Sequence, residues 1–223
     1  MKTIAIIPAR GGSKRLRNKN ILLLGGIPLI AHSILYAQRN NAIIDAVYVT
    51  TDNEAIKKIA LEYGAIVIDR PAHLSGDLEP TVSALRHVVE SISRDTDHLN
   101  IVLLQPTNPL RPENLLRDAF MSYKKENYSS LFTVTPHHQK LGKIVDNQYI
   151  PFNYAIGQRS QDMEPLFFEN GLLYISTAKL VMQDIIISES AFPYPVTHLF
   201  ASIDIDTQQD FEYAEYLSKT HNL

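Results

Sequence analysis

Short apolar runs alternate with longer segments whose apolar residues recur at helical spacing, and this alternation constrains the fold more than any other feature. Strands are predicted by the apolar runs at 4–8, 46–50, 65–69, 100–104, 129–135, 171–176 and 201–206. Helices are predicted at 27–39, 54–63, 79–91, 112–125, 177–183 and 208–217. Strands and helices that alternate in this way form βαβ units with parallel strands and right-handed connections. We therefore expect an α/β fold of three layers, with a mostly parallel sheet between helices.

The composition is that of an ordinary globular protein, with 45% hydrophobic and 20% charged residues among 223. A net charge of −3 argues against a nucleic-acid coat or a binder of acidic membranes. Without cysteine the chain has no disulfide and no thiolate metal site, which permits a cytoplasmic location. No apolar run approaches the roughly 18 residues of a membrane span. A strand that starts within three residues of the first leaves no room for a signal peptide. We expect a cytoplasmic protein without nucleic-acid or membrane partners.

The first strand runs directly into a loop that carries glycines and many basic residues. Gly11 and Gly12 would allow backbone conformations closed to other residues and a close approach of ligand to the main chain. The basic residues of the loop are Arg10, Lys14, Arg15, Arg17 and Lys19. Exposed backbone N–H groups together with such cations predict a phosphate site. The spacing is that of neither a P-loop nor a dinucleotide-binding loop.

A solvated basic turn is the alternative reading of this loop. No acidic residue precedes Asp45, so the cations have no partner nearby in the sequence. The loop also follows the first strand, and open α/β sheets bind ligands beyond the carboxyl ends of their strands. Both points favour the phosphate site.

Two carboxylates follow one another closely near the end of the chain. On a strand, Asp204 and Asp206 would lie on the same face, where like charges need a compensating cation. Oxygen ligands without His or Cys suit Mg²⁺. The alternative is that Asp206 only caps the closing helix, which leaves Asp204 unexplained. The eight histidines lack zinc spacing and are read as residues of the surface or of a substrate loop.

The strand at 100–104 leads into a segment stiffened by Pro106 and Pro109. We expect this segment to bring Gln105 and Arg111 to the same rim as the basic loop, although an ordinary strand-to-helix connector fits equally well.

From 136 to 165 the regular alternation of strands and helices stops. An irregular stretch of this length inside a compact domain is usually functional. It fits either a substrate lid or an extension that packs on a second subunit.

Together these motifs resemble the acylneuraminate cytidylyltransferase family, the CMP-sialic acid and CMP-nonulosonic acid synthetases. The similarity runs in order along the chain, at 9–14, 19–20, 70–71, 104–111, 170–171, 174–175 and 204–207. It implies a Rossmann-like nucleotidyltransferase fold with a small protruding dimerisation arm. The implied core comprises 1–135 and 166–223, the arm 136–165, and the assembly is a homodimer.

The reaction implied by the resemblance joins CTP to a nine-carbon 2-keto acid sugar, releases pyrophosphate and requires Mg²⁺. The product, a CMP-sugar, would serve cell-surface polysaccharide biosynthesis. The sugar would be N-acetylneuraminate or a related nonulosonic acid. Many sialic acid members have Gly in place of Arg15 and a basic residue in place of Phe168, so the resemblance leaves the sugar open.

The resemblance also assigns roles to individual residues. The nucleotide would be bound by Arg10, Gly11, Gly12, Ser13, Lys14, Lys19, Asn20, Arg70 and Thr81. The sugar would be bound by Gln105, Lys140, Lys143 and Arg159, with help from a second subunit. The metal would be held by Asp204 and Asp206. Catalysis would depend on Arg10, Lys14, Lys19 and Asp206.

Two other functions are compatible with parts of the pattern. A 3-deoxy-manno-octulosonate cytidylyltransferase or a phosphosugar nucleotidyltransferase would share the opening loop, but the segments 105–111 and 204–207 favour the sialic acid branch. A non-catalytic nucleotide-binding protein could use the same scaffold, since fold does not fix function. The presence of both aspartates and the full set of cations argues against it.

Overall fold

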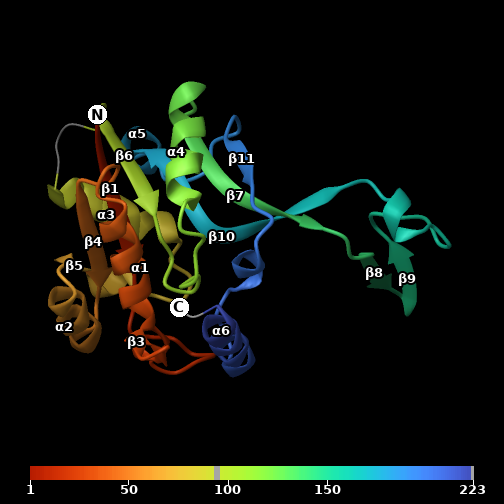
Figure 1. Cartoon of the computed structure of the whole chain (residues 1–223), viewed down its shortest axis with the longest axis horizontal. Helices are drawn as coiled ribbons and strands as arrows, with labels where there is room; N and C mark the ends of the chain where they lie inside the picture. The colour runs from red at the N-terminus through yellow and green to blue at the C-terminus, as the bar shows by residue number, and fades with distance from the viewer. Residues whose placement is uncertain (93–95, 222–223) are drawn as a thin grey trace.

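A mostly parallel sheet lies at the centre of the computed structural model, which describes residues 1–92 and 96–221 (Figure 1). In this part of the chain the sheet has seven strands in the order β11-β7-β10-β6-β1-β4-β5. They are β1 (Lys2–Pro8), β4 (Ala46–Thr51), β5 (Ile66–Asp69), β6 (Leu99–Leu103), β7 (Ser130–His137), β10 (Leu166–Thr177) and β11 (Phe192–Pro195). Only β10 runs antiparallel to its neighbours, β6 and β7. The predicted α/β class is confirmed.

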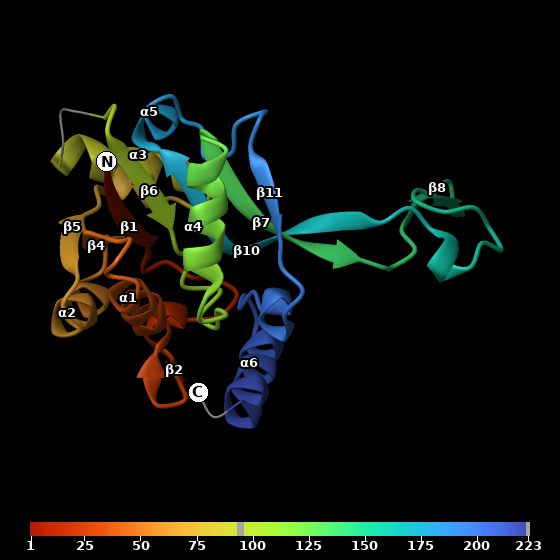
Figure 2. The same ribbon diagram turned by 45° about the horizontal axis from the view of Figure 1, so that its top comes forward.

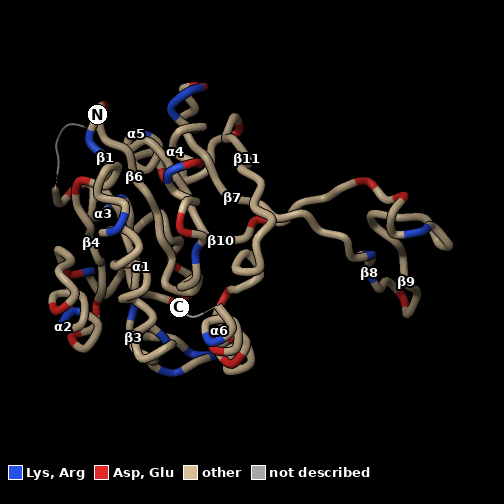
Figure 3. The backbone as a smooth tube through the Cα atoms, viewed as in Figure 1, with Lys and Arg blue, Asp and Glu red and all other residues tan. Residues whose placement is uncertain are grey.

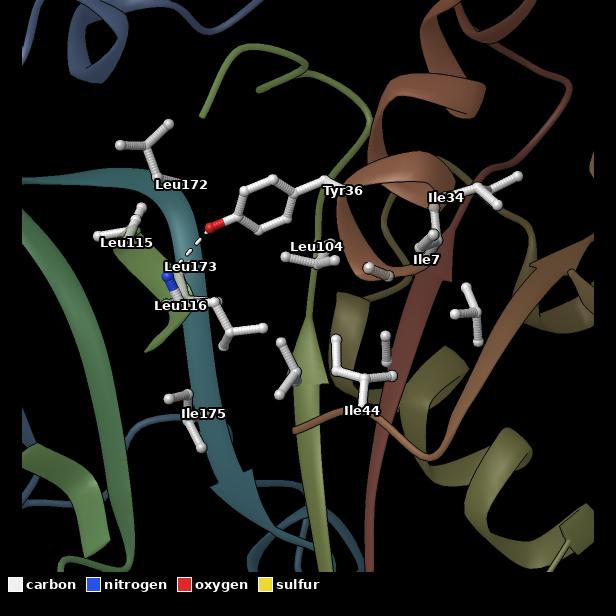
Figure 4. Packing of buried hydrophobic residues seen from close by; sticks show 14 of the residues in the cluster. Ile7, Ile34, Tyr36, Ile44, Leu104, Leu115, Leu116, Leu172, Leu173 and Ile175 are labelled. Atoms are coloured by element: carbon white, nitrogen blue, oxygen red, sulfur yellow. Dashed lines mark hydrogen bonds between the residues drawn. The ribbon is translucent and has the colours of Figure 1, made fainter. Parts of the chain in front are cut away.

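Helices cover both faces of the sheet and complete the three layers. One face packs against α1 (Leu29–Arg39), α2 (Glu54–Glu62) and α4 (Leu115–Lys125). The other face packs against α3 (Thr81–Ile92) and α5 (Ala178–Val181). In the first layer the Tyr36 hydroxyl accepts a hydrogen bond of 3.0 Å from the Leu116 N–H and so ties α1 to α4 (Figure 4). The last helix, α6 (Gln208–Thr220), packs on a third apolar cluster that includes Leu16 and Leu24.

Local sequence signals explain several helix ends. The Asn53 side chain accepts hydrogen bonds from the N–H groups of Ala55 and Ile56 at the start of α2. Gly64 follows α2 with a φ of 78°, a conformation that favours glycine. Thr207 and Asp210 form a reciprocal capping box at the start of α6. The alternative that Asp206 caps this helix is therefore wrong, and its side chain is left for other contacts.

The predicted strand at 201–206 is wrong. This stretch begins with the end of the short 3₁₀ helix η4 (Leu199–Ser202) and continues as extended chain that joins no strand of the described sheet. Ile203 and Ile205 are buried, whereas the side chains at 204 and 206 point outward. The alternating pattern is real, but it comes from extended chain lying on the third apolar cluster. A hydrogen bond of 2.8 Å from the Ile205 N–H to the Thr107 carbonyl holds it there.

Outside the stretch 136–165, three of the described strands were not anticipated. The edge strand β11 was missed because Pro193 and Pro195 weaken the strand signal, although prolines are tolerated at an edge. A small hairpin of β2 (Leu23–Leu24) and β3 (Ile27–Pro28) turns through two glycines with positive φ, Gly25 and Gly26.

The helices in the described ranges include none with the length and apolar character that a membrane span requires.

The irregular stretch predicted at 136–165 projects away from the rest of the molecule (Figure 1 and Figure 2). The ends of β7 and β10 pair from His137 and Leu166 inward and form its base. At its tip lies the hairpin of β8 (Gly142–Val145) and β9 (Gln148–Pro151). The first two residues of the predicted arm, 136 and 137, belong to β7, so we call residues 138–165 the arm. The division of the chain into core and arm as separate domains stays a prediction.

Candidate active site

A cavity of about 520 Å³ opens beyond the carboxyl end of β1. The chain supplies its walls from the basic loop, from 70–84, from 105–107 and from Asp206. Nine of the residues predicted for the site line it: Arg10, Ser13, Lys14, Lys19, Asn20, Arg70, Thr81, Gln105 and Asp206. Figure 3 shows the basic positions of the opening loop following one another between β3 and α6. After the role that the resemblance implies for its residues, we call this space the nucleotide cavity.

Four of the five cations of the loop have acidic partners among the described residues, and these partners come from distant parts of the chain. Arg10 lies 2.9 Å from the Asp77 carboxylate, and Lys14 forms an ion pair with its other oxygen. Arg15 and Lys19 contact Asp206 at 2.7 and 2.8 Å. Hydrogen bonds, first from Lys14 and then from Arg10, hold the pKa of Asp77 below its usual value. Each carboxylate thus gathers two cations, which keeps four positive charges together beside one cavity.

Arg70 is a buried cation in the wall of the nucleotide cavity. It is 9% exposed, and burial lowers its pKa to about 10. Its guanidinium donates to the Thr50 carbonyl at 2.6 Å and to the Thr50 hydroxyl at 3.3 Å. These bonds to the end of β4 fix the side chain in place. A desolvated, immobile donor of this kind is suited to binding an acceptor oxygen.

The two glycines of the basic loop do not adopt the expected backbone conformation. Neither has a positive φ, and neither lines the nucleotide cavity. The Gly11 N–H donates to the Asp52 carboxylate at 2.9 Å, so this group is already engaged. A Cβ at Gly11 would lie 2.9 Å from that of Asn53, so the position requires glycine for space and not for conformation. A Cβ at Gly12 would meet open space. The expectation of a special backbone conformation at these glycines is wrong.

Arg111 lies in the interior and not at the rim where it was expected. It is 7% exposed, and it donates to the carbonyls of Leu172 and Gln105 and to the Ser33 hydroxyl at 2.7–3.0 Å. Burial lowers its pKa to about 10. Arg111 therefore positions the backbone of Gln105 from behind. Asn20 acts in a similar way, since its amide donates to the Arg10 carbonyl at 2.9 Å and pins the basic loop.

A second cavity, of about 360 Å³, adjoins the first through Gln105, which lines both. After the sugar contact that the resemblance implies for Gln105, we call it the acceptor cavity. It is lined by Gln105, Asn108, Phe168, Glu169, Asn170, Gly171, Tyr174, Ala201, Ser202 and Asp204. There is no Lys or Arg among these described lining residues, and two of them are acidic. The Tyr174 hydroxyl donates to Glu169 at 2.5 Å, and burial, followed by this bond, raises its pKa.

Sequence reasoning assigned only Gln105 and Asp204 of this second cavity to a site. Five of the others lie on β10, whose register with β7 shifts between Glu169 and Tyr174. Gly171, with a φ of 75°, lies in this bulge. The Asn108 amide locks it by donating to the carbonyls of Asn170 and Ile203, at 3.1 and 2.6 Å. The Asn-Gly pair inside an apolar strand was the signal that could have marked the cavity.

Asp204 and Asp206 lie on the outward side of one extended segment, with Asp204 in the acceptor cavity and Asp206 in the nucleotide cavity. Burial raises the pKa of Asp204, and the neighbouring Asp206 adds to the shift. Among the residues with described positions, no three His, Cys, Asp or Glu gather as a metal cluster. A cation here would need further ligands from phosphate and water, which is how Mg²⁺ is usually bound. The donor set therefore fits Mg²⁺ together with a phosphate-bearing ligand.

Three residues predicted for the sugar lie on the arm, and within one chain they line neither cavity. Arg159 forms two hydrogen bonds with Asp162, at 2.7 and 3.0 Å. Lys140 lies over the Tyr154 ring, 5.1 Å from its centroid. Lys143 is exposed on β8. One protomer does not bring these side chains to Gln105, and their assignment to the sugar stays a prediction.

Comparison with known proteins places the chain among transferases of cytidine nucleotides. Residues 4–223 match the Cytidylyltransferase family. The pseudaminic acid cytidylyltransferase of Campylobacter jejuni is 32% identical over 100% of this chain and 98% of its own. The CMP-N,N'-diacetyllegionaminic acid synthase of Legionella pneumophila is 35% identical over 97% and 96%. An N-acylneuraminate cytidylyltransferase of Streptococcus agalactiae is 33% identical over 95% of this chain, which spans 52% of that longer protein.

The fold is also that of a known synthetase. The structure of CMP:2-keto-3-deoxy-manno-octonic acid synthetase complexed with CTP superposes with a TM-score of 0.76, covering 99% of this chain and 100% of the other at 17% identity. The predicted Rossmann-like nucleotidyltransferase fold is thereby confirmed. The family match over nearly the whole chain and the full-length relatives agree: the chain belongs to the cytidylyltransferase family that contains the CMP-nonulosonic acid synthetases.

Proposed function

We propose that the protein transfers the cytidylyl group of CTP to a nonulosonic acid, a nine-carbon 2-keto acid sugar, with release of pyrophosphate. The observation that carries the proposal is the pair of adjoining cavities that share Gln105, one rich in cations and one without any among its described lining residues. The relatives named for pseudaminic and legionaminic acid span the full chain and support this substrate class. The cytoplasmic location stays a prediction.

The reaction is a direct displacement at phosphorus. The anomeric hydroxyl of the sugar attacks the α-phosphorus of CTP and gives up its proton to solvent. A new P–O bond forms, and the bond to pyrophosphate breaks as that group leaves in line. Positioning and charge neutralisation are the main contributions that a protein makes to such a step. Arg10, Lys14 and Lys19 would bind the phosphate oxygens and balance the charge that develops on the leaving pyrophosphate.

Other residues of the nucleotide cavity would orient CTP. Arg70, held by Thr50, and Thr81, at the start of α3, lie on the side of the cavity formed by 70–84 and would contact the nucleoside. Gln105 stands where the two cavities meet and would contact the sugar beside the reacting hydroxyl. Asp204 and Asp206 would hold Mg²⁺, which when bound supplies charge neutralisation at phosphate and lowers the pKa of a nearby hydroxyl.

A sugar acid carries its own carboxylate, which needs a cation. The described lining of the acceptor cavity offers none and adds the carboxylates of Glu169 and Asp204. We infer that the cation comes from the arm of a second subunit, from Lys140, Lys143 or Arg159. A homodimer is supported by exposed apolar side chains of the arm, which a second subunit would bury. They are Ile144, Val145, Tyr149, Ile150 and Phe152. The competing possibility is a lid that folds over the site of its own chain.

The acceptor separates this proposal from its alternatives. The similarity to the manno-octonic acid synthetase rests on shape at 17% identity and so concerns the fold alone. Pyrophosphate release from CTP should be measured with N-acetylneuraminate, legionaminate, pseudaminate and 3-deoxy-manno-octulosonate as separate acceptors. We expect turnover with one of the nine-carbon sugars. Turnover with the eight-carbon sugar alone, or with none of the four despite CTP binding, would contradict the proposal.

A further inference from the structure

Asp77 forms ion pairs with two of the cations that the proposed function assigns to the triphosphate, Arg10 and Lys14. Its two carboxylate oxygens contact Arg10 and Lys14, and Asp77 itself lines the nucleotide cavity. A phosphate group that binds the same two cations would bring its oxygens close to this carboxylate. Two anions at such a distance repel one another. Asp77 and the phosphate therefore exclude each other from full contact with Arg10 and Lys14.

The segment that carries Asp77 has few ties to the rest of the chain. Residues 75–80 connect η2 (Ala72–Leu74) to α3, and Leu78 is 97% exposed. The hydrogen bonds of this segment with described residues are local, reaching only Pro71, Ala72 and Ser83. Arg10 and Lys14 are the exceptions, through the two ion pairs and a contact of 3.5 Å between the Arg10 guanidinium and the Ser75 carbonyl. Displacing Asp77 from the two cations therefore breaks no other long-range hydrogen bond among these residues.

We propose that Asp77 is a resident counter-anion that competes with the pyrophosphate portion of CTP for Arg10 and Lys14, and so sets the affinity of the enzyme for polyphosphate. This inference rests on the proposed function. Asp77 keeps two cations beside one cavity in the absence of a polyanion and yields them to a ligand with more negative charge. By the same competition it weakens the binding of pyrophosphate, so it favours release of this product.

The competition has a quantitative consequence. A ligand that binds only when Asp77 is displaced has its affinity reduced by the fraction of molecules in which the cations are free. The reduction applies equally to CTP and to pyrophosphate, which need Arg10 and Lys14, and not to cytidine, which has no phosphate. Exposed ion pairs are individually weak. We therefore expect Asp77→Asn to raise the affinity for CTP and for pyrophosphate about 3- to 30-fold, by similar factors. The affinity for cytidine should not change.

The test is the binding of CTP, inorganic pyrophosphate and cytidine, each alone, measured by calorimetry on the full chain. Asp77→Asn is compared with Glu79→Gln, which removes a charge from the same segment and the same cavity wall at a residue without an ion pair to any described residue. Glu79→Gln therefore shows how much the binding of anions improves when one negative charge is removed from the cavity wall without breaking an ion pair. A third variant, Asp184→Asn, removes a carboxylate that pairs with Arg86 and lines neither cavity.

The proposal requires that Asp77→Asn tighten pyrophosphate clearly more than Glu79→Gln does, and that the gain shrink when Lys14→Ala is added. Equal gains in pyrophosphate affinity in the two variants would mean that any lost negative charge near the cavity has this effect, and would overturn the proposal. Weaker binding in Asp77→Asn would show that Asp77 holds Arg10 and Lys14 ready for the ligand, which also overturns it. If the unaltered protein binds neither CTP nor pyrophosphate, the proposed function itself fails and this inference fails with it.

Discussion

Lys19 donates a hydrogen bond of 2.8 Å to Asp206, a residue 187 positions away in the sequence. The Lys19 side chain is only 11% exposed, so this contact is the least solvated of the ion pairs around the nucleotide cavity. It joins the basic loop after β1 to the segment that carries both aspartates. The side of the cavity expected to bind phosphate and the side expected to bind the metal are thus built as one unit, although opposite ends of the chain supply them.

The first prediction concerns the aspartates. Asp206→Asn should reduce turnover below about 1% of the original, because it removes charge needed by Mg²⁺ and by Lys19 together. Asp204→Asn should be similar or milder. The measurement is pyrophosphate release at saturating CTP and limiting Mg²⁺, with a thermal unfolding curve to confirm that the fold is intact. Near-normal rates in both variants would show that the metal is not held here.

The second prediction concerns the basic loop. Arg10→Ala or Lys14→Ala should raise the KM for CTP far more than the KM for the sugar. Each removes a charge-assisted hydrogen bond to phosphate worth roughly 1.5–3 kcal/mol, about 10- to 150-fold. The lower end is expected, because the competing contact with Asp77 is lost as well. Arg117→Ala, whose ion pair with Asp118 lies outside both cavities, is the matched control. A change in the sugar KM alone would argue against this placement of the loop.

The third prediction tests whether subunits share a site. We expect mixtures of inactive Asp206→Asn and Arg159→Ala proteins to recover part of the activity, since one of the two sites in each heterodimer would then be intact. Sedimentation should show a dimer at working concentrations. A monomer, or no recovery after confirmed subunit exchange, would favour a lid over a shared arm.

The fourth prediction concerns Arg111, which supports Gln105 from the interior. Arg111→Ala should destabilise the fold by about 3–5 kcal/mol, because it leaves the buried acceptors at Leu172 and Ser33 without their donor. Arg111→Lys should recover only part of this loss, since an ammonium cannot reproduce the planar fork of donors. Urea unfolding measures both. A loss below about 1 kcal/mol for Arg111→Ala would mean that water replaces the guanidinium.

The fifth prediction is a pH dependence centred on His32. Burial lowers the pKa of this imidazole, opposed by backbone hydrogen bonds that include one of 3.0 Å to the Leu24 carbonyl, with Arg111 and Arg39 adding to the lowering. The folded protein therefore binds the proton less readily than the unfolded chain does. The stability from neutral His32 is present above about pH 6.5 and is lost as the pH falls below that value, toward the folded pKa. His32→Gln should flatten the fall in melting temperature between pH 7.5 and 5.5. An unchanged slope would assign the loss to other groups.

The features that sequence reasoning predicted well depend on local rules. Asn53 and Gly64 mark the ends of α2 because capping and a positive φ act within a few residues. The basic loop was placed correctly because a strand followed by cations needs no knowledge of distant partners. The same locality explains why capping by Asp206 was a plausible alternative, although Thr207 and Asp210 form the capping box.

The features that were missed depend on contacts across the sequence. Arg111 was expected at the rim, but its carbonyl acceptors come from β10 and from Gln105, and these hold it inside. The partners Asp77 and Asp206 lie far from the loop that they organise. The acceptor cavity depends on a register shift in β10, which no pattern of apolar residues encodes. Apart from the Asn170–Gly171 pair, which marks the register shift in β10, these long-range contacts leave no local signal in the sequence.

The antiparallel strand β10 begins at Leu166, at the base of the arm, and reaches Glu169 and Tyr174 in the acceptor cavity within its next eight residues. Whatever holds the arm therefore also holds this wall of the acceptor cavity, whereas the nucleotide cavity is lined by the basic loop, the 70–84 segment, residues 105–107 and Asp206. Dilution that separates subunits should weaken the affinity for the acceptor before the affinity for CTP. A single continuous strand would thus make acceptor recognition sensitive to protein concentration while leaving nucleotide recognition independent of it.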